Sequence, residues 1–91
     1  MTENELKTAI KRHARLNGWA VHDDGQERVM HKSGDKGYPD LTCARDGEVL
    51  WIECKDDVGI LSPGQYMWQM ALPAYHVIRP KDWSRVLELL A

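Results

Sequence analysis

Apolar residues recur at helical spacing near the start of the chain. Leu6, Ile10 and Ala14 stand four residues apart, which is typical of the buried face of an amphipathic helix. Thr2 and Glu5 have the spacing of a capping box, in which each side chain bonds to the backbone N–H of the other residue. The pattern predicts a first helix that begins after Thr2, and it gives Glu5 a structural role as the cap partner.

Two strand-like segments flank a turn signal in the middle of the chain. Residues 41–45 and 49–54 have strand composition, and the Asp-Gly pair at 46–47 is favoured in two-residue hairpin loops. With such a loop, Arg45 faces Glu48, and opposed residues have numbers that sum to 93. The pattern therefore predicts a β-hairpin in this register, which a one-residue bulge would shift.

Both faces of this hairpin are largely apolar. One face carries Leu41, Cys43, Leu50 and Ile52, which we expect to meet the core. The other face carries Thr42, Ala44, Val49 and Trp51. Both faces therefore need cover, either by helices or by a second subunit.

The rest of the chain predicts two more strands and two more helices. In chain order they are a strand at 19–22, a polar loop at 23–36, a helix opened by Ser62, Pro63 and Gln65, a strand at 75–79 and a helix at 80–91. The second helix has an apolar stripe of Met67, Trp68, Ala71 and Leu72, and the last helix has one of Trp83, Val86, Leu87 and Leu90. A crossover through the second helix pairs the last strand with the strand that contains Glu53. We expect one α/β domain over 1–91, a small mixed β-sheet in α-β-β-β-α-β-α order flanked by helices.

Two carboxylates lie opposite each other at the open end of the hairpin. Asp40 and Glu53 also have numbers that sum to 93, so they share one face, and Lys55 follows two residues further along it. Opposed like charges destabilise a hairpin unless one is protonated, cations pair with them or a metal ion binds them. Mg²⁺ accepts one or two carboxylates together with water and a substrate phosphate. The alternative is a solvated ladder of charges at a hairpin end.

Composition narrows the class of protein. The chain of 91 residues is 43% hydrophobic and 29% charged, which is the balance of a small soluble globular domain. It has no apolar run near the roughly 20 residues of a membrane span, and its polar, acidic start is unlike a secretory signal. Cys43 and Cys54 lack a metal-binding spacing, so we expect reduced thiols and a cytoplasmic location.

The net charge of −2 does not indicate a nucleic-acid-binding protein by itself. The basic residues nevertheless cluster in two places. These are Lys7, Lys11, Arg12 and Arg15 in the first helix, and Arg28, His31, Lys32 and Lys36 in the loop before Asp40. Each cluster forms either a local basic surface or an ordinary solvated one.

The residues around the carboxylate pair resemble a known family. Pro39-Asp40 followed by Glu53-x-Lys55 is the short motif of the PD-(D/E)XK nuclease superfamily. Matches in the right order along nearly the whole chain resemble one branch of it, the VRR-NUC (virus-type replication-repair nuclease) domain. They are Glu5 in the first helix, Gly37 to Asp40, Glu53 to Lys55, and the helix start at Ser62-Pro63-Gly64-Gln65. The glycine often found before the family's last strand is absent. The resemblance implies a restriction-endonuclease-like core.

The resemblance also implies an activity. It is that of a metal-dependent endonuclease that hydrolyses DNA phosphodiester bonds in phage or bacterial DNA replication and repair. Branched or structured DNA, such as a four-way junction or a flap, would be the substrate. Asp40, Glu53 and the backbone carbonyl of Cys54 would hold Mg²⁺ or Mn²⁺, and Lys55 would stabilise the transition state.

Two further catalytic expectations follow from the same resemblance, and the basic cluster before Asp40 supplies the expected DNA-binding residues. Glu5 would hold a second metal or orient a water, and Gln65 would orient Lys55 or a water. Each of these two also has a purely structural explanation as a helix cap, which for Gln65 is the favoured one. The expected DNA-binding residues are Arg28, His31, Lys32 and Lys36.

A surplus of aromatic and methionine residues predicts a homodimer, because such side chains are enriched at interface cores and a two-fold dimer presents two sites. The residues concerned are Trp51, Met67, Trp68, Met70 and Trp83. Two other classes compete with the enzyme. One is a catalytically inactive nuclease-fold module that binds DNA or a protein, and the other is a stability or assembly protein of a mobile element.

Overall fold

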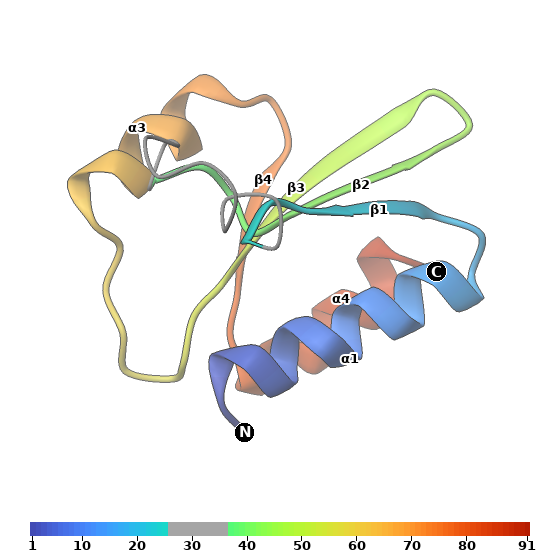
Figure 1. Cartoon of the computed structure of the whole chain (residues 1–91), viewed down its shortest axis with the longest axis horizontal. Helices are drawn as coiled ribbons and strands as arrows, with labels where there is room; N and C mark the ends of the chain where they lie inside the picture. The colour runs from blue at the N-terminus through green and yellow to red at the C-terminus, as the bar shows by residue number, and fades with distance from the viewer. Residues whose placement is uncertain (26–36) are drawn as a thin grey trace.

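The computed structural model describes residues 1–25 and 37–91. Its elements are α1 (Glu3–Leu16), β1 (Ala20–Asp23), β2 (Leu41–Arg45), β3 (Glu48–Cys54), α3 (Pro63–Ala71), β4 (Tyr75–Ile78), the short 3-10 helix η1 (Pro80–Asp82) and α4 (Trp83–Leu89). Figure 1 shows a four-stranded sheet, with α1 and α4 together on one side and α3 standing apart from them. The α/β class and the mixed sheet predicted from the sequence are confirmed.

The hairpin has the predicted register. Arg45 pairs with Glu48 and Leu41 pairs with Ile52, so opposed numbers sum to 93 along the whole ladder. Asp46 and Gly47 both have positive φ, 53° and 81°, as a type I′ turn requires. The strand order is β1-β2-β3-β4, with β1 antiparallel to β2, β2 antiparallel to β3, and β4 parallel to β3.

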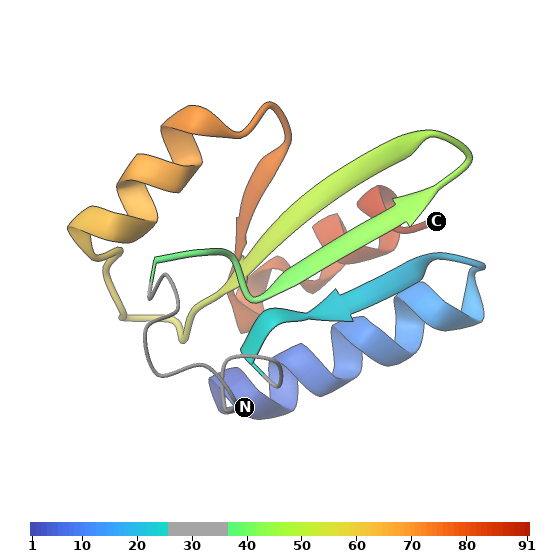
Figure 2. The same ribbon diagram turned by 45° about the horizontal axis from the view of Figure 1, so that its top comes forward.

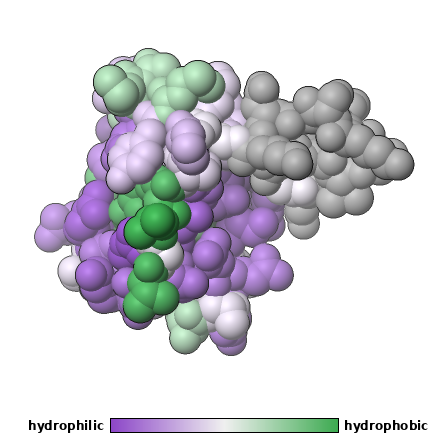
Figure 3. All heavy atoms as spheres, turned by 90° about the vertical axis from the view of Figure 1, so that its left-hand side faces the viewer, coloured by the Kyte–Doolittle hydropathy of each residue, from purple (hydrophilic) through white to green (hydrophobic). Residues whose placement is uncertain are grey.

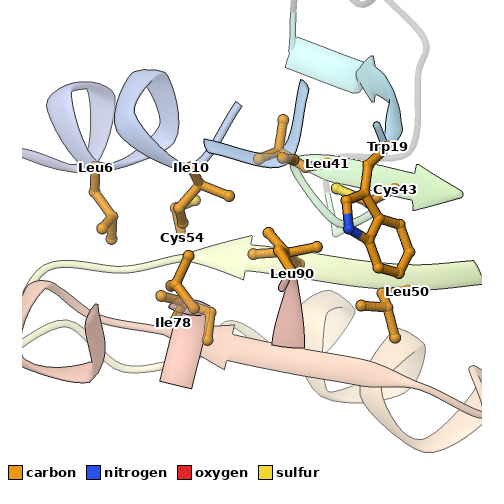
Figure 4. Packing of buried hydrophobic residues seen from close by; sticks show 12 residues of the cluster. Leu6, Ile10, Trp19, Leu41, Cys43, Leu50, Cys54, Ile78 and Leu90 are labelled. Atoms are coloured by element: carbon orange, nitrogen blue, oxygen red, sulfur yellow. The ribbon is translucent and has the colours of Figure 1, made fainter. Parts of the chain in front are cut away.

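The inner face of the sheet carries the core. Leu6, Ile10 and Ala14 of α1 are fully buried against it, as the helical spacing predicts. From the other side of the core come Val86 of α4 and Leu90, which are also fully buried. The close-up in Figure 4 shows the labelled side chains of α1, β3, β4 and the C-terminal segment pointing into one shared space. Leu87 is an exception to the predicted stripe of the last helix, because it is 46% exposed.

The outer face of the sheet is covered differently. No residue of α3 is buried, and Met67 and Met70 are 59% and 87% exposed. The apolar stripe predicted for this helix therefore does not insert into the core. Figure 2, turned from the first view, again shows α3 well separated from α1 and α4. The loop that leads into α3 is also apolar and open, with Val58 and Ile60 strongly exposed.

A few specific contacts hold α3 in place. A Cβ atom added at Gly37 would collide with the backbone of Gly64 in the first turn of α3. The ring of Tyr38 meets the ring of Trp68 edge to face, with centroids 4.9 Å apart. The Tyr38 hydroxyl in turn accepts a hydrogen bond from Trp51 Nε1 at 3.2 Å. The segment before β2 thus connects α3 to the outer face of the sheet.

The sequence predicts no membrane-spanning segment and two reduced cysteines. None of the helices within 1–25 and 37–91 is long and apolar enough to cross a membrane. Cys43 and Cys54 are buried and free.

Candidate functional site

The hairpin register brings Asp40 and Glu53 together on the outer face. Asp40 directly precedes β2, and its carbonyl accepts a hydrogen bond from the N–H of Asp24 at 2.9 Å, which continues the β1–β2 pairing. Its carboxylate oxygen Oδ2 accepts a hydrogen bond from the backbone N–H of Cys54 at 2.9 Å. The Asp40 side chain is therefore fixed at the end of β3, beside Glu53.

Glu53 is a buried carboxylate, only 3% exposed. Burial, followed by the negative charge of Asp40, raises the pKa of Glu53 to about 8, while the charge of Lys55 acts in the opposite direction. Asp40 and Glu53 are close enough to share a proton when Glu53 is protonated. Such a pair is stabilised by that proton or by a cation in its place.

The two oxygens of Glu53 have different surroundings. Oε2 accepts a hydrogen bond from Gln65 Nε2 at 2.9 Å. Oε1 is buried, and no described residue donates a hydrogen bond to it. A buried carboxylate oxygen without a partner is costly, and a proton shared with Asp40 or a cation in its place would offset that cost.

Gln65 is both a helix cap and a site residue. Its Oε1 accepts a hydrogen bond from the N–H of Ser62 at 2.8 Å, and Ser62 Oγ accepts one from the N–H of Gln65 at 3.2 Å, which completes the predicted capping box. The remaining amide group, Nε2, is then directed at Glu53. The two interpretations of Gln65 are therefore compatible, although its partner in the site is Glu53 instead of Lys55.

Lys55 continues the outer-face alternation from Glu53. It is half-buried, and its N–H donates to the carbonyl of Ile78 at 3.0 Å, which extends the β3–β4 pairing past the end of the strand. Its charge lowers the pKa of Glu53, so the ammonium lies within electrostatic reach of the carboxylate pair. The sequence-predicted trio of Asp40, Glu53 and Lys55 is thus assembled at one place.

Glu5 lies elsewhere. Its Oε1 accepts a hydrogen bond from the N–H of Thr2 at 2.8 Å, which confirms the capping box. It lines a surface hollow with Arg12 and Trp83, whereas a separate small pocket of about 90 Å³ adjoins Asp40 and Cys54. The structure does not bring Glu5 to the carboxylate pair.

Glu3 is the acidic residue of α1 that faces the site. It lines the small pocket together with Asn4, Lys7, Asp40 and Cys54, and its charge helps to raise the pKa of Glu53. Residues two apart on an α-helix project about 200° from each other, so Glu3 and Glu5 cannot share a face. Glu3 stands three residues before the buried Leu6, so both lie on the same side of α1. This spacing is the sequence signal that would have pointed to Glu3.

Tyr75 is a second site residue that the sequence analysis missed. It begins β4 on the outer face, beside Trp51. Its hydroxyl is buried, and no described residue bonds to it. Burial and the charges of Glu53 and Asp40 raise the pKa of Tyr75. Only the pairing of β4 with β3 reveals this proximity.

The structure describes one of the two basic clusters and not the expected DNA-binding residues. Arg28, His31, Lys32 and Lys36 lie outside the described residues. In α1, the ammonium groups of Lys7 and Lys11 lie 3.4 and 2.8 Å from carboxylate oxygens of Asp23, which is buried. Of the four basic residues in this cluster, Lys7 and Lys11 are therefore neutralised by Asp23, and Arg12 and Arg15 are exposed.

The donor set is compatible with a hard divalent cation. Within 1–25 and 37–91, no three His, Cys, Asp or Glu side chains converge as a ready-made metal cluster. The available ligands are Asp40, Glu53 with its unpartnered Oε1, and the backbone at Cys54. Two carboxylates with the other positions left to carbonyl, water and phosphate oxygens suit Mg²⁺. They do not suit Zn²⁺, which prefers nitrogen and sulfur ligands.

The chain matches no protein-family model, no curated protein and no solved structure. The resemblance to VRR-NUC domains therefore rests on the motif residues and stays a prediction.

Proposed function

We propose that the chain is a Mg²⁺- or Mn²⁺-dependent DNA endonuclease with a restriction-endonuclease-like core of the VRR-NUC type. The observation that supports this most is the buried Asp40–Glu53 pair with Lys55 beside it. Glu53 keeps an oxygen without a donor in a buried position, which is costly, and a bound cation would offset that cost where the pair has lost its proton. A plain charged ladder at a hairpin end would be solvated, whereas Glu53 is 3% exposed.

Each residue has a role in this mechanism. Asp40, Glu53 and the carbonyl of Cys54 would hold the cation, which supplies charge neutralisation and an activated water when bound. Gln65 orients the Glu53 carboxylate through its hydrogen bond to Oε2. The Lys55 ammonium stabilises the negative charge that develops on the phosphoryl oxygens. Glu3 takes the place that the family resemblance gives to the acidic residue of the first helix.

A plasmid-nicking assay with Mg²⁺ or Mn²⁺, and with EDTA as the blank, tests the proposal. We expect Asp40→Asn and Glu53→Gln to abolish cleavage, and Lys55→Ala to reduce it at least about a hundredfold, as the loss of one transition-state charge does. Glu48→Gln is the matched control, because it makes the same carboxylate-to-amide change on an exposed residue at the far end of β3. Cleavage by Asp40→Asn at the wild-type rate would disprove the assignment.

The substrate proposed is branched or structured DNA. This part rests on the family resemblance. Cleavage rates on a four-way junction and on a linear duplex of the same sequence provide the test. Equal rates would remove the preference for structured DNA and leave the endonuclease assignment intact.

We also propose a homodimer, supported by the exposed methionines of α3. Met67 and Met70 are 59% and 87% exposed, and adjacent apolar residues of this size commonly mark an interface. Light scattering should give twice the 10.5 kDa chain mass, and Met70→Lys should give the monomer. Leu87→Lys is the control at an exposed apolar position of α4. A wild-type monomer that retains full activity would contradict the dimer.

The competing function is a catalytically inactive nuclease-fold module that binds DNA or a protein. The same exposed side of α3 favours it, because a docking helix presents an apolar face. Metal-independent DNA or protein binding without cleavage would support this alternative.

A further inference from the structure

A groove lies between α3 and β4, one strand away from Glu53. Ile60, Leu61, Tyr66 and Gln69 form one side of it, and Val77, Arg79, Lys81, Asp82 and Arg85 form the other, around a volume of about 360 Å³. Val77 pairs with Glu53 in the parallel ladder, and neighbouring strands are about 4.8 Å apart. Tyr66 follows Gln65, whose amide bonds to Glu53. The groove therefore adjoins the carboxylate pair.

The groove is cationic in a chain whose net charge is −2. Its lining has three basic side chains and one carboxylate, that of Asp82, and the Asp57 carboxylate beside it accepts a hydrogen bond from the Lys81 N–H at 3.3 Å. Among the residues that the structure describes, no ion pair joins Arg79, Lys81 or Arg85 to a carboxylate. By contrast, Lys7 and Lys11 of α1 are both paired with Asp23.

The two arginines are held by neutral acceptors. Arg79 Nη1 donates to the carbonyl of Asp56 at 2.6 Å. Arg85 Nη1 donates to the carbonyl of Val77 at 3.3 Å, and Nη2 lies 3.4 Å from His76 Nδ1. These contacts orient the guanidinium groups without neutralising them. A guanidinium that is fixed but unneutralised is suited to an oxyanion such as a phosphate.

The opposite side of the groove is apolar and aromatic. Tyr66 is 53% exposed and Ile60 is 83% exposed. Figure 3, which looks at the side of the molecule where α3 and its preceding loop lie, shows hydrophobic side chains next to hydrophilic ones on that surface. Cations that track a backbone, with an aromatic ring on which a base stacks, are the two parts of a nucleic-acid strand site.

We propose that this groove binds a DNA strand beside the cleavage site, with Lys81 and Arg85 on backbone phosphates and Tyr66 against a base or sugar. The inference rests on the proposed nuclease function, to which it adds the path of the substrate. It also explains how an acidic chain would bind a polyanion, because the positive charge is concentrated where the strand passes.

The test is fluorescence anisotropy with a labelled single-stranded oligonucleotide in EDTA, so that binding is measured without cleavage. We expect the double variant Lys81→Ala/Arg85→Ala to weaken binding at least tenfold. The slope of log affinity against log salt should decrease by roughly 1.4 to 1.8, because each lost phosphate contact removes about 0.7 to 0.9. Tyr66→Leu should weaken binding a few-fold with an unchanged slope, because it removes stacking but no charge.

The matched control is Arg12→Ala/Arg15→Ala, which removes two exposed positive charges from α1 on the other side of the sheet. Equal losses in the two double variants would overturn the inference, since they would show an unspecific effect of net charge. No loss in the groove variant would overturn it as well. Equally strong competition by an oligoglutamate peptide would also overturn it, because the groove would then recognise acidic chains in general.

Failure of this inference and failure of the proposed function give different results. If wild type cleaves DNA and the groove variant binds as wild type does, the groove assignment is wrong and the nuclease stands. If wild type binds through the groove but does not cleave with Mg²⁺ or Mn²⁺, the strand site stands and the enzyme assignment is wrong.

Discussion

The inner face of the sheet is sealed by α1 and α4, whereas the outer face carries α3, which buries none of its residues. On the inner side, fully buried aliphatic side chains such as Ile10 and Ile52 belong to one apolar cluster. On the outer side, the contacts of α3 within the described residues include a close approach of Gly37 to Gly64, the Tyr38–Trp68 ring pair and the Gln65–Glu53 hydrogen bond. The inner face supplies the stability that lets the outer face keep a costly carboxylate pair.

The largest expected difference between the two faces is in folding stability. Ile10→Ala should lower the free energy of unfolding by about 2 to 5 kcal/mol, because it leaves a cavity in the core. Met70→Ala should change it by less than about 0.5 kcal/mol, because the side chain is already in solvent. Urea denaturation of both variants, at a concentration where the oligomeric state is unchanged, measures the two values. Similar losses would show that α3 is packed more tightly than its exposure indicates.

The next effect is the pH dependence that Glu53 imposes. Its folded-state pKa is raised from 4.5 to about 8, so the folded protein keeps a proton that the unfolded chain releases. The stabilisation is complete below pH about 4.5 and is lost as the pH rises through about 8. In EDTA we expect a loss of roughly 2 kcal/mol across this range. The full shift of the Glu53 pKa corresponds to an upper limit of about 5 kcal/mol for this loss, since one pKa unit is about 1.4 kcal/mol.

The control for this effect is Glu53→Gln, which has no charge to lose. The stability of this variant should change less with pH than that of wild type. In wild type, added Mg²⁺ should restore the stability that is lost at pH 8. His76, whose pKa is lowered by burial and by the charge of Arg85, is present in both proteins and cancels. If the stability of the two proteins changed with pH in the same way, Glu53 would not be the source of the pH dependence.

The smallest expected effect concerns the attachment of α3. Gly37→Ala places a methyl group against the backbone of Gly64, so α3 must shift and the Gln65–Glu53 contact loosens. We expect cleavage to fall about tenfold and stability by about 1 kcal/mol. Gly47→Asn is the control, because the hairpin turn has open space and a positive φ that Asn tolerates. Equal rates for the two variants would show that the position of α3 has no influence on the site.

Much of the candidate site was predictable from local rules. The Asp-Gly turn at 46–47 fixed the register, and the period of two residues then placed Asp40, Glu53 and Lys55 on one face. The two capping boxes, at Thr2 and Ser62, were also readable from spacing. Each of these features depends on residues close together along the chain or joined by one tight turn.

Other parts of the site depend on contacts between distant elements. The family resemblance pointed to Glu5, whereas Glu3 is the acidic residue of α1 that lines the small pocket with Asp40 and Cys54. For Lys7 and Lys11 the sequence left a basic surface and an ordinary solvated one open, because nothing local shows that Asp23 pairs with both. The proximity of Tyr75 requires knowledge of the register between β3 and β4, which no turn fixes.

By itself, the sequence determined the elements, the hairpin register and the pairing of two carboxylates, because hydrophobic periodicity, caps and turns act over a few residues. Only the tertiary structure decided the rest, namely that α3 stays outside the core, that Glu53 is buried with an unpartnered oxygen, and that Arg79, Lys81 and Arg85 line a groove beside it. The physical reason is that burial and charge compensation are properties of a position in space. They depend on which distant segments pack together, and the same local pattern is compatible with several such packings.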